Sequence, residues 1–302
     1  GVTVRDDYVT IAHLKFTDFA NATNYSAAIE IDGNHDLAVR DCWIDAKSDH
    51  GILIGFRSAA PATAVSNDVV VERCALLNAI AAGADAANRG DAIHIMSGSR
   101  RLRVSNCVFY EYVQSGIHYM TGDADEIDSR LRNNVFLSSS ATAVAIKVVD
   151  PGSQTGFDSD HNCCRLSGAA QTGQWGATGC VTLADWRATS GRDASSTDRD
   201  PHLANLVPGS EDFHLQSTFG RKSGGVWVLD PVDSACIDAG DPLSASNGEG
   251  TETVGGGRID IGMWGNTGHA SLSGSPEADF TWTGKSGIFG TSNTNWSDPE
   301  NW

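Results

Sequence analysis

Histidines recur in near-identical short motifs, together with a carboxylate that could support acid–base or metal chemistry. His94 lies in "DAIHI", His118 lies in "SGIHY", and His50 opens "HGILI". Asp91 stands three residues before His94. Imidazole titrates near neutral pH, so it serves as a general acid or base, and it is also a common ligand of Zn²⁺. These residues can act together only if the fold sets their segments side by side.

A repeat of about thirty residues supplies that arrangement. The first recurring set is "VTIAHLKF" (9–16), "LAVRDCWI" (37–44), "VVVERCAL" (69–76), "LRVSNCVF" (102–109), "SRLRNNVF" (129–136) and "DSDHNCCR" (158–165). The second set is "AAIEI", "HGILI", "DAIHI", "SGIHY", "TAVAI" and "GCVTL". Such short segments bury their inward side chains only by stacking on the next repeat. The sequence therefore predicts an all-β, right-handed parallel β-helix with three strands per rung, about six to eight rungs and an irregular C-terminal cap.

Columns of the repeat predict which side chains line the lumen. The sixth column of the first set holds Leu14, Cys42, Cys74, Cys107, Asn134 and Cys163. The seven cysteines are predicted to be buried thiols rather than a disulfide framework. Because adjacent residues of a strand face opposite ways, Cys163 and Cys164 cannot both face the lumen, and one of them is expected to be accessible. Asn residues in the fifth column are expected to satisfy the turn backbone at a corner.

The second set predicts a functional column on the outer face of one sheet. The inward residues are taken as Ile29, Ile52, Ile93, Ile117, Val144 and Val181, so the next residues point outward: Glu30, Leu53, His94, His118, Ala145 and Thr182. Because neighbouring strands lie about 4.8 Å apart, His94 and His118 should stack. His50 and Asp91 are placed to one side, with Lys147 one rung further on.

The strands "LRVSNCVF" and "SGIHY" resemble those of the pectate-lyase-like superfamily of parallel β-helix proteins, and the resemblance covers about residues 3–183. It implies the fold, which serves lyases, hydrolases, adhesins and stalks alike. In its lyase-like members, substrate binds on one sheet face beside long loops. The insertion at 78–90 is expected to overhang the histidine face in the same way. The calcium-binding Asp set of a lyase and the paired Asp of polygalacturonase-type hydrolases have no residue-level match here.

Three interpretations of the histidine face stay open. In the first it is an enzyme site for an acidic polysaccharide: His94, His118 or Lys147 acts as the base, and Arg89 neutralises a uronate carboxylate. In the second, His50, Asp91, His94 and His118 bind a transition metal, although a flat sheet seldom converges four ligands. In the third, the histidines are a ladder on a solvated sheet of a structural, adhesive or glycan-binding surface protein. The sequence favours the third.

Further candidates lie elsewhere. His50, Asp91, Glu30, Arg103 and Arg130 are candidates for glycan contact. Arg103 and Arg130 are outward neighbours on another sheet, and the sequence favours their pairing with acids such as Glu72 and Asp128 over glycan binding. Carboxylates are the usual Ca²⁺ ligands, so Asp238, Asp241 and Asp260 are weak candidates for a cation such as Ca²⁺. The sequence favours a role for these three in fixing turns and pairing with Arg258.

The domain organisation follows from where the period is lost. Residues 1–184 are predicted as the coil and 185–265 as the final rungs and cap, where "SACIDAGDP" and "GRIDIGMWG" resemble the closing segments of bacterial surface β-helix proteins. Residues 266–279 read as a Gly/Ser/Pro-rich linker. Residues 280–302 resemble the start of a second β-rich module, because their W-T-G opening and paired "NW" are typical of secreted surface repeats.

Composition narrows the class of partner. With 21 basic and 38 acidic residues the net charge is −17, which disfavours nucleic acid and anionic membranes as partners. No apolar run is long enough to span a membrane. The sequence predicts a secreted or cell-surface bacterial protein that contacts polysaccharide or other protein chains, with head-to-tail self-assembly as a further expectation.

Overall fold

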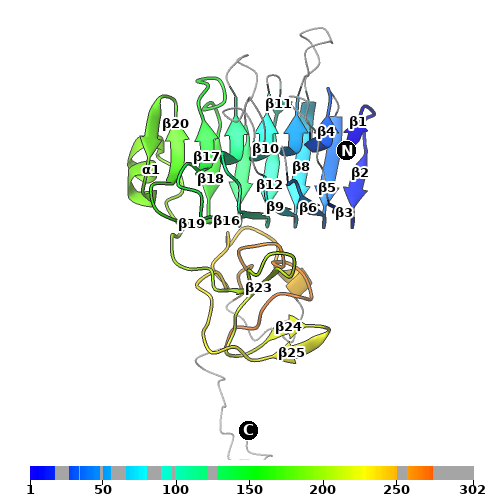
Figure 1. The fold of residues 1–302 in the computed structure, drawn as a ribbon, viewed down its shortest axis with the longest axis vertical. Helices are drawn as coiled ribbons and strands as arrows, with labels where there is room; N and C mark the ends of the chain where they lie inside the picture. The colour runs from blue at the N-terminus through cyan, green and yellow to red at the C-terminus, as the bar shows by residue number, and fades with distance from the viewer. Residues whose placement is uncertain are drawn as a thin grey trace, which may run out of the picture.

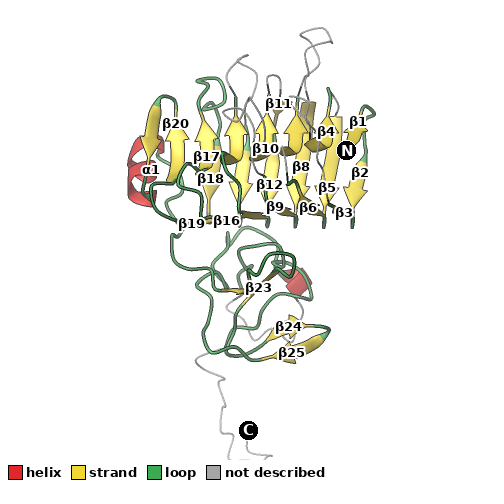
Figure 2. Cartoon of the chain, viewed as in Figure 1, coloured by secondary structure: helices red, strands yellow, loops and turns green. Residues whose placement is uncertain are grey.

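The computed structural model describes residues 1–17, 27–33, 35–47, 50–55, 66–79, 90–96, 99–120, 128–249 and 257–274. Residues 1–180 wind into a coil of three parallel sheets, and a smaller C-terminal unit follows it (Figure 1). Strands make up nearly all of the regular structure, and the one α-helix lies at the far end of the coil from the N-terminus (Figure 2). The predicted parallel β-helix is confirmed.

The first sheet holds eight strands, in the order β1 (Val2–Val4), β4 (Ala27–Ile31), β7 (His50–Ile54), β10 (Asp91–Ile95), β14 (Ser115–Tyr119), β17 (Val144–Val148), β20 (Gln171–Trp175) and β21 (Thr178–Cys180). All neighbours in it are parallel except the final hairpin of β20 and β21. Its register pairs His94 with Leu53 on one side and with His118 on the other.

Two further sheets complete each rung. The second holds β2 (Thr10–Ala12), β5 (His35–Arg40), β8 (Ser66–Glu72), β12 (Arg103–Ser105), β15 (Arg130–Arg132) and β18 (Asp158–Asp160), with β11 (Ser99–Arg100) paired beside β8. The third holds β3 (Lys15–Phe16), β6 (Trp43–Asp45), β9 (Ala75–Leu77), β13 (Val108–Tyr110), β16 (Val135–Ser138) and β19 (Cys163–Leu166).

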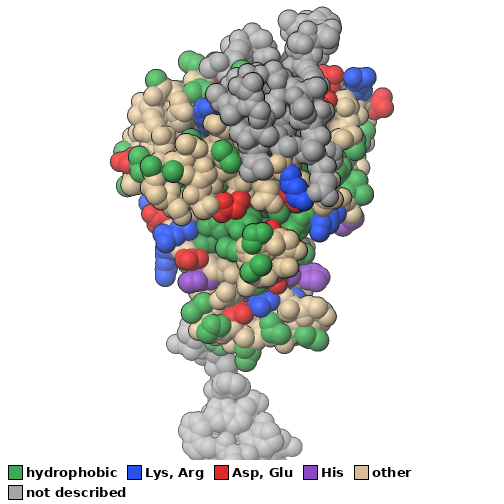
Figure 3. All heavy atoms as spheres, in the orientation of Figure 1, with side chains coloured by type: hydrophobic (Ala, Val, Ile, Leu, Met, Phe, Trp, Pro, Cys, Tyr) green, Lys and Arg blue, Asp and Glu red, His purple; other side chains and the backbone are tan. Residues whose placement is uncertain are grey.

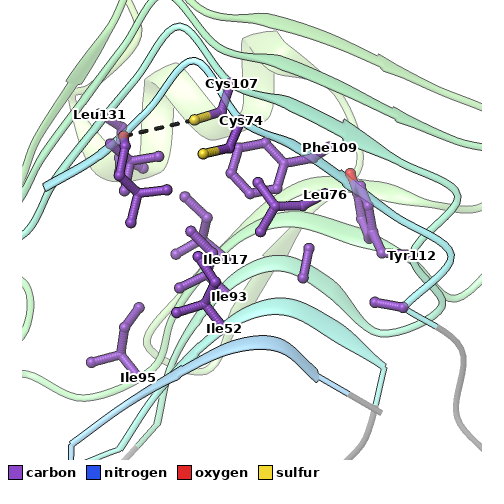
Figure 4. Packing of buried hydrophobic residues seen from close by; sticks show 14 of the residues in the cluster. Ile52, Cys74, Leu76, Ile93, Ile95, Cys107, Phe109, Tyr112, Ile117 and Leu131 are labelled. Atoms are coloured by element: carbon purple, nitrogen blue, oxygen red, sulfur yellow. Dashed lines mark hydrogen bonds between the residues drawn. The ribbon is translucent and has the colours of Figure 1, made fainter. Parts of the chain in front are cut away.

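Like side chains from successive rungs stack in the lumen. Ile52, Ile93 and Ile117 form one column, and Cys74 and Cys107 lie next to each other in a second (Figure 4). Each of these side chains is fully buried. Burial of this kind contributes about 1.5–3 kcal/mol per large aliphatic side chain, which drives the rungs to stack in this one register. The prediction of buried thiols in this column is confirmed.

The corner between the second and third sheets explains the polar columns. Its residue adopts the left-handed backbone conformation in successive rungs: Asp41, Arg73, Asn106, Asn133 and His161 all have positive φ. At the following position, the Oδ1 of Asn134 accepts a hydrogen bond from the Cys107 backbone N–H, and Asn162 caps the Asn134 N–H in the same way. Buried turn backbone is therefore satisfied by stacked asparagines.

The last rung differs from the predicted alignment by one residue. Asn162, not Cys163, follows Asn134 in the lumen stack, because Val135 pairs with Cys163 and Phe136 with Cys164. Cys164 therefore faces the lumen. Cys163 faces outward but is fully buried beside Cys236, so the expectation of an accessible thiol in this pair is wrong.

Helix α1 (Leu183–Ser190) closes the end of the coil. Thr182 and Asp185 form a capping box at its first turn, and Gly191 ends it in the left-handed conformation. The indole of Trp186 is fully buried against Gly173, which stands at the position of the isoleucine column in the last parallel strand. Any Cβ at residue 173 would lie within 2.2 Å of that indole. The final strand of the coil therefore has a glycine because the helix places a tryptophan over the open lumen.

The C-terminal unit comprises residues 198–249 and 257–274, with β22 (Leu203–Asn205), β23 (Asp212–Leu215), β24 (Arg221–Ser223), β25 (Val226–Val228) and the 3₁₀ turn η2 (Asn247–Glu249). It packs on the outer face of the third sheet, where Val108 and Val135 meet Phe213 and Ile261. It does not lie over the end of the lumen, where the cap was expected. The corner residue Asn106 donates hydrogen bonds to the carbonyl oxygens of Asp260 and Gly262.

Residues 266–274, expected to be linker, belong to this unit. Ala270 and Ser271 are buried, and the Ser271 hydroxyl donates a hydrogen bond to the Leu215 carbonyl oxygen. The remainder of the predicted linker and the predicted second module at 280–302 lie outside the described residues.

Candidate functional site

The motif histidines meet around one carboxylate on the outer face of the first sheet. We call His50, Asp91, His94 and His118 the histidine cluster. The Oδ2 atom of Asp91 lies 2.7 Å from Nδ1 of His94, 3.1 Å from Nδ1 of His118 and 3.8 Å from Nδ1 of His50. The ring centroids of His50 and His94 are 4.5 Å apart, and those of His94 and His118 are 5.0 Å apart. His94 and His118 are neighbours in register, as predicted, but their rings meet edge to face at 85° rather than stacked.

A break in the alternation of β10 puts Asp91 and His94 on the same face. Ala92 and Ile93 are consecutive residues, yet both lie in the lumen core. In a regular strand, residues three apart face opposite ways. Two consecutive inward residues shift the phase by one, so Asp91 and His94 both point outward. In the neighbouring strands the residue before the isoleucine is Gly51 or Gly116, where a Cβ would lie within 2.7 Å of a carbonyl oxygen of the next strand.

Hydrogen bonding and burial set the protonation of the cluster. Burial alone would raise the pKa of Asp91, but the hydrogen bonds from His118 and His94 hold that pKa far below its ordinary value. Burial and the nearby His94 together lower the pKa of His50 to about 3. Burial also lowers the pKa of His118, against the opposing effect of the hydrogen bond to Asp91 and of its charge. At neutral pH the cluster therefore contains an ionised Asp91 carboxylate beside His50 and His118, whose imidazoles favour the neutral form.

The cluster is not the solvated ladder that the sequence favoured. The exposed fractions are 1% for His50, Asp91 and His94, and 8% for His118. This prediction was wrong because strand alternation shows which side chains leave the lumen, and it does not show whether the outer face is covered. Substrate cannot contact His94 in this conformation, and His118 is the most exposed residue of the cluster.

Lys147 lies closer to His118 than predicted. Ile117 pairs with Ile146 rather than with Val144, so the predicted alignment of β17 was wrong by two residues and Lys147 pairs directly with His118. The half-buried Glu30 pairs with Leu53, which separates it from His94, and its Oε2 accepts a hydrogen bond from Thr3. Arg89 and the insertion at 80–89 lie outside the described residues.

A second charged surface lies on the outer face of the second sheet. We call Arg103, Arg130 and Arg132 the arginine ladder. Arg103 on β12 pairs in register with Arg130 on β15, and both are exposed. The carboxylate of Asp158 binds two of the three guanidinium groups: its Oδ2 lies 3.1 Å from Nε of Arg130 and 2.6 Å from Nη2 of Arg132.

Arg103 has no carboxylate partner within the described part of the chain. Its Nη1 donates a hydrogen bond to the backbone oxygen of Asp128 at 3.4 Å. Asp68, which lies close enough for Arg103 to help lower its pKa, is held chiefly by a two-point contact with Arg101. The pairing expected with Glu72 does not occur, because Glu72 binds Arg40 and Arg73. Arg103 thus forms no ion pair among the described residues, and its exposed guanidinium can bind an anionic ligand.

The surface around this ladder is mixed in charge. Although burial opposes it, the hydrogen bond from Arg132 keeps the pKa of Asp158 below its ordinary value. The face drawn in Figure 3 shows Lys and Arg side chains beside Asp and Glu side chains, without one broad field of either sign among the described residues. On this face, attraction for a polyanion would therefore be local.

The predicted cation site in the C-terminal unit has a different composition. Asp238 and Asp260 lie together with Glu249, which the sequence analysis missed, and the three carboxylates offer ligand atoms within 4.8 Å of one another. Asp241 is elsewhere: its Oδ2 lies 3.3 Å from Nε of Arg132. Arg258 binds the carbonyl oxygens of Ala239 and Gly240 rather than an acid.

Backbone N–H groups already occupy both carboxylate oxygens of Asp260 and one of Glu249. Asp260 accepts from Asp238 and Ser271, and Glu249 accepts from Asp260 and Asn266. Burial and the proximity of Glu249 raise the pKa of Asp260, and burial raises the pKa of Glu249. These bonds fix turns of the C-terminal unit, the role that the sequence favoured over a cation site. The segments "SACIDAGDP" and "GRIDIGMWG" pointed to Asp238 and Asp260 in the sequence, whereas Glu249 had no such signal.

Comparison with known proteins identifies the fold of the coil. Residues 1–147 match the protein family described as right handed beta helix region. No curated protein matches the sequence. A solved structure named "Glycoside hydrolase" aligns with 62% of this chain at 12% sequence identity and a TM-score of 0.34, and the aligned part is 40% of that protein. This chain thus spans less than half of the length of that protein.

Within the described residues, no helix is both long and apolar enough to cross a membrane. The family match and the parallel strand register describe the same architecture over the same segment. Residues 1–147 therefore match a family whose description, right handed beta helix, agrees with the parallel β-helix that the structure shows there.

Proposed function

We propose that this β-helix protein binds an anionic polysaccharide through the arginine ladder on its second sheet. The observation that supports this function is the exposed Arg103 guanidinium, which has no acidic partner among the described residues and lies beside the exposed Arg130. Guanidinium groups bind carboxylate and sulfate oxygens through two parallel hydrogen bonds. The parallel pairing of β12 with β15 places Arg103 and Arg130 on adjacent strands about 4.8 Å apart, so two anionic groups of one polysaccharide chain can bind together.

The net charge of the protein makes the ladder necessary for such binding. At −17, the chain as a whole repels a polyanion. Screening by salt weakens this long-range repulsion, and it also weakens the exposed guanidinium contacts. Asp158 competes with the ligand for Arg130, but it also forms an ion pair with Arg132. Arg130 can therefore exchange its partner without leaving Asp158 unpaired.

Binding should distinguish anionic from neutral polysaccharides. We expect pectate, alginate, hyaluronan or chondroitin sulfate to retain the full chain, and neutral dextran not to. Raising NaCl from about 0.1 M to about 1 M shortens the Debye length from about 10 Å to about 3 Å and should release the bound protein. Affinity electrophoresis or isothermal titration calorimetry measures both effects. Equal retention by neutral and anionic chains would exclude this proposal.

Polysaccharide lyase or hydrolase chemistry at the first sheet is the second candidate. It is supported by the placement of Lys147 directly beside His118, the most exposed histidine of the cluster. The burial of His94 counts against it, because a base must come within about 3 Å of the proton that it removes.

We therefore expect no unsaturated product when the protein is incubated with pectate, alginate, hyaluronan or chondroitin. The measurement is ultraviolet absorbance with Ca²⁺ and with chelator, and reducing-end release covers hydrolysis. Product formed by the unmodified chain but not by a His118→Ala variant would move the function to the first sheet. A His35→Ala variant is the matched control, since His35 is an exposed histidine on β5.

A further inference from the structure

The histidine cluster has the spacing of metal ligands. Three imidazole nitrogens surround Asp91 Oδ2, at 2.7, 3.1 and 3.8 Å. A tetrahedral Zn²⁺ bound at 2.0–2.1 Å holds its ligand atoms about 3.3 Å apart. The observed separations bracket that value. His50, Asp91 and His94 each offer one ligand atom, and these atoms all lie within 4.8 Å of one another.

The carboxylate of the cluster lacks a full set of partners. Asp91 is 1% exposed, and its Oδ1 makes no hydrogen bond within the described part of the chain. A buried carboxylate is costly unless it is paired with a cation or binds a metal. Lys147 is not in position to pair with it, because Lys147 lies on β17 and the strand β14 separates β17 from β10. Two strand spacings amount to about 9.6 Å.

The shape of the sheet removes the main objection to a metal here. A flat sheet presents its outward side chains in parallel rows, which do not converge. In β10, the consecutive inward residues Ala92 and Ile93 bring Asp91 and His94 to one face and to within hydrogen-bond distance. His50 enters from β7, the neighbouring strand. The site thus draws two ligands from one strand and a third from the next.

We propose that His50, Asp91 and His94 bind a divalent transition-metal ion, with Zn²⁺ as the reference ion. Two imidazoles and one carboxylate suit Zn²⁺, whereas Ca²⁺ requires six to eight oxygen ligands. His118 is the positioning residue, because its Nδ1 donates to Asp91 and holds the carboxylate toward the ion. The inference is independent of polysaccharide binding, which belongs to another sheet.

Binding would cross-link consecutive rungs of the coil. β7 and β10 are neighbours in the first sheet, although thirty-six residues of the chain lie between the last residue of β7, Ile54, and the first residue of β10, Asp91 (91 − 54 − 1). An ion that binds only the folded chain stabilises it by an amount that grows with the logarithm of the ratio of free ion concentration to Kd. The bound metal should therefore raise the midpoint of thermal unfolding, and chelator should lower it.

The test uses the full chain, stripped with chelator and dialysed, then titrated with ZnCl₂ by calorimetry and checked by elemental analysis. We expect about one Zn²⁺ per chain. His50→Ala and His94→Ala should each abolish binding. His118→Gln should weaken it by about 10–100-fold, as loss of an outer-shell partner does. His35→Ala is the matched control and should bind as the unmodified chain does.

Co²⁺ gives a readout that needs no variant. Added to the stripped protein, Co²⁺ should produce the visible absorption bands of a tetrahedral nitrogen–oxygen site. Zn²⁺ should displace the Co²⁺ and abolish these bands. These bands keep the proposal testable if a histidine variant does not fold. A stripped chain that takes up neither ion would overturn the proposal. Zn²⁺ retained by both the His50→Ala and the His94→Ala variants would also overturn it, and would place the ion at another cluster.

Discussion

Replacing Trp186 by alanine should lower the free energy of unfolding by about 3–5 kcal/mol, the usual cost of removing a buried tryptophan. The indole is fully buried against Gly173 and Trp175 at the end of the lumen. Its Nε1 donates a 2.7 Å hydrogen bond to Asp193, which also accepts from Asn162. The substitution therefore opens the lumen and disturbs the corner asparagine stack together.

Urea unfolding followed by circular dichroism measures this loss. The matched control is Trp227→Ala, which removes a partly exposed indole of the β24–β25 hairpin that stacks under Lys222. The control should lower the free energy of unfolding by no more than about 1 kcal/mol, because the side chain already contacts water. Equal effects of the two substitutions would mean that α1 is not what closes the coil.

This closure illustrates what the sequence could not predict. Repeating columns predicted the coil, since a stack of isoleucines and cysteines has one register that buries them all. The end of the coil has no repeat of its own. Gly173 interrupts the isoleucine column, and only the structure shows that Trp186 fills the space. For the same reason, the location of the C-terminal unit on the third sheet had no signal in the sequence.

Errors of register arose where the pattern itself is ambiguous. In β17 the residues Val144, Ile146 and Val148 are all apolar at a spacing of two, so a shift of two residues leaves the pattern unchanged. The adjacent Cys163 and Cys164 allowed a shift of one. Both errors were small, yet the first concealed that Lys147 lies beside His118.

The histidine cluster shows a different limit of sequence reasoning. The motifs correctly predicted that His94 and His118 lie side by side on adjacent strands. Their burial was not, and neither was the phase shift at Ala92 and Ile93. Strict alternation would have separated Asp91 from His94, whereas the structure joins them at 2.7 Å. The break in strand alternation at Ala92 and Ile93 thus decides whether Asp91 and His94 can act together as one site.

We expect the affinity for an anionic polysaccharide to depend on the positions of Arg103 and Arg130, and not only on their positive charge. Replacing both Arg103 and Arg130 by serine should lower affinity for an anionic polysaccharide by about 10–100-fold. Each hydrogen bond to a charged group contributes about 1.5–3 kcal/mol when well formed and less at an exposed site. The fold should persist, because Asp158 keeps its contact with Arg132.

The control removes the same charge from other surfaces. Arg5 lies near the N-terminus with a side chain that is 77% exposed, and the exposed Arg165 lies on β19 in the third sheet. Each double serine variant takes the net charge from −17 to −19, since each loses two positive charges. General electrostatics would therefore weaken both variants equally in a calorimetric titration. A loss confined to the Arg103/Arg130 variant requires a defined contact at the arginine ladder, and an equal loss in both would reduce the proposed site to nonspecific attraction.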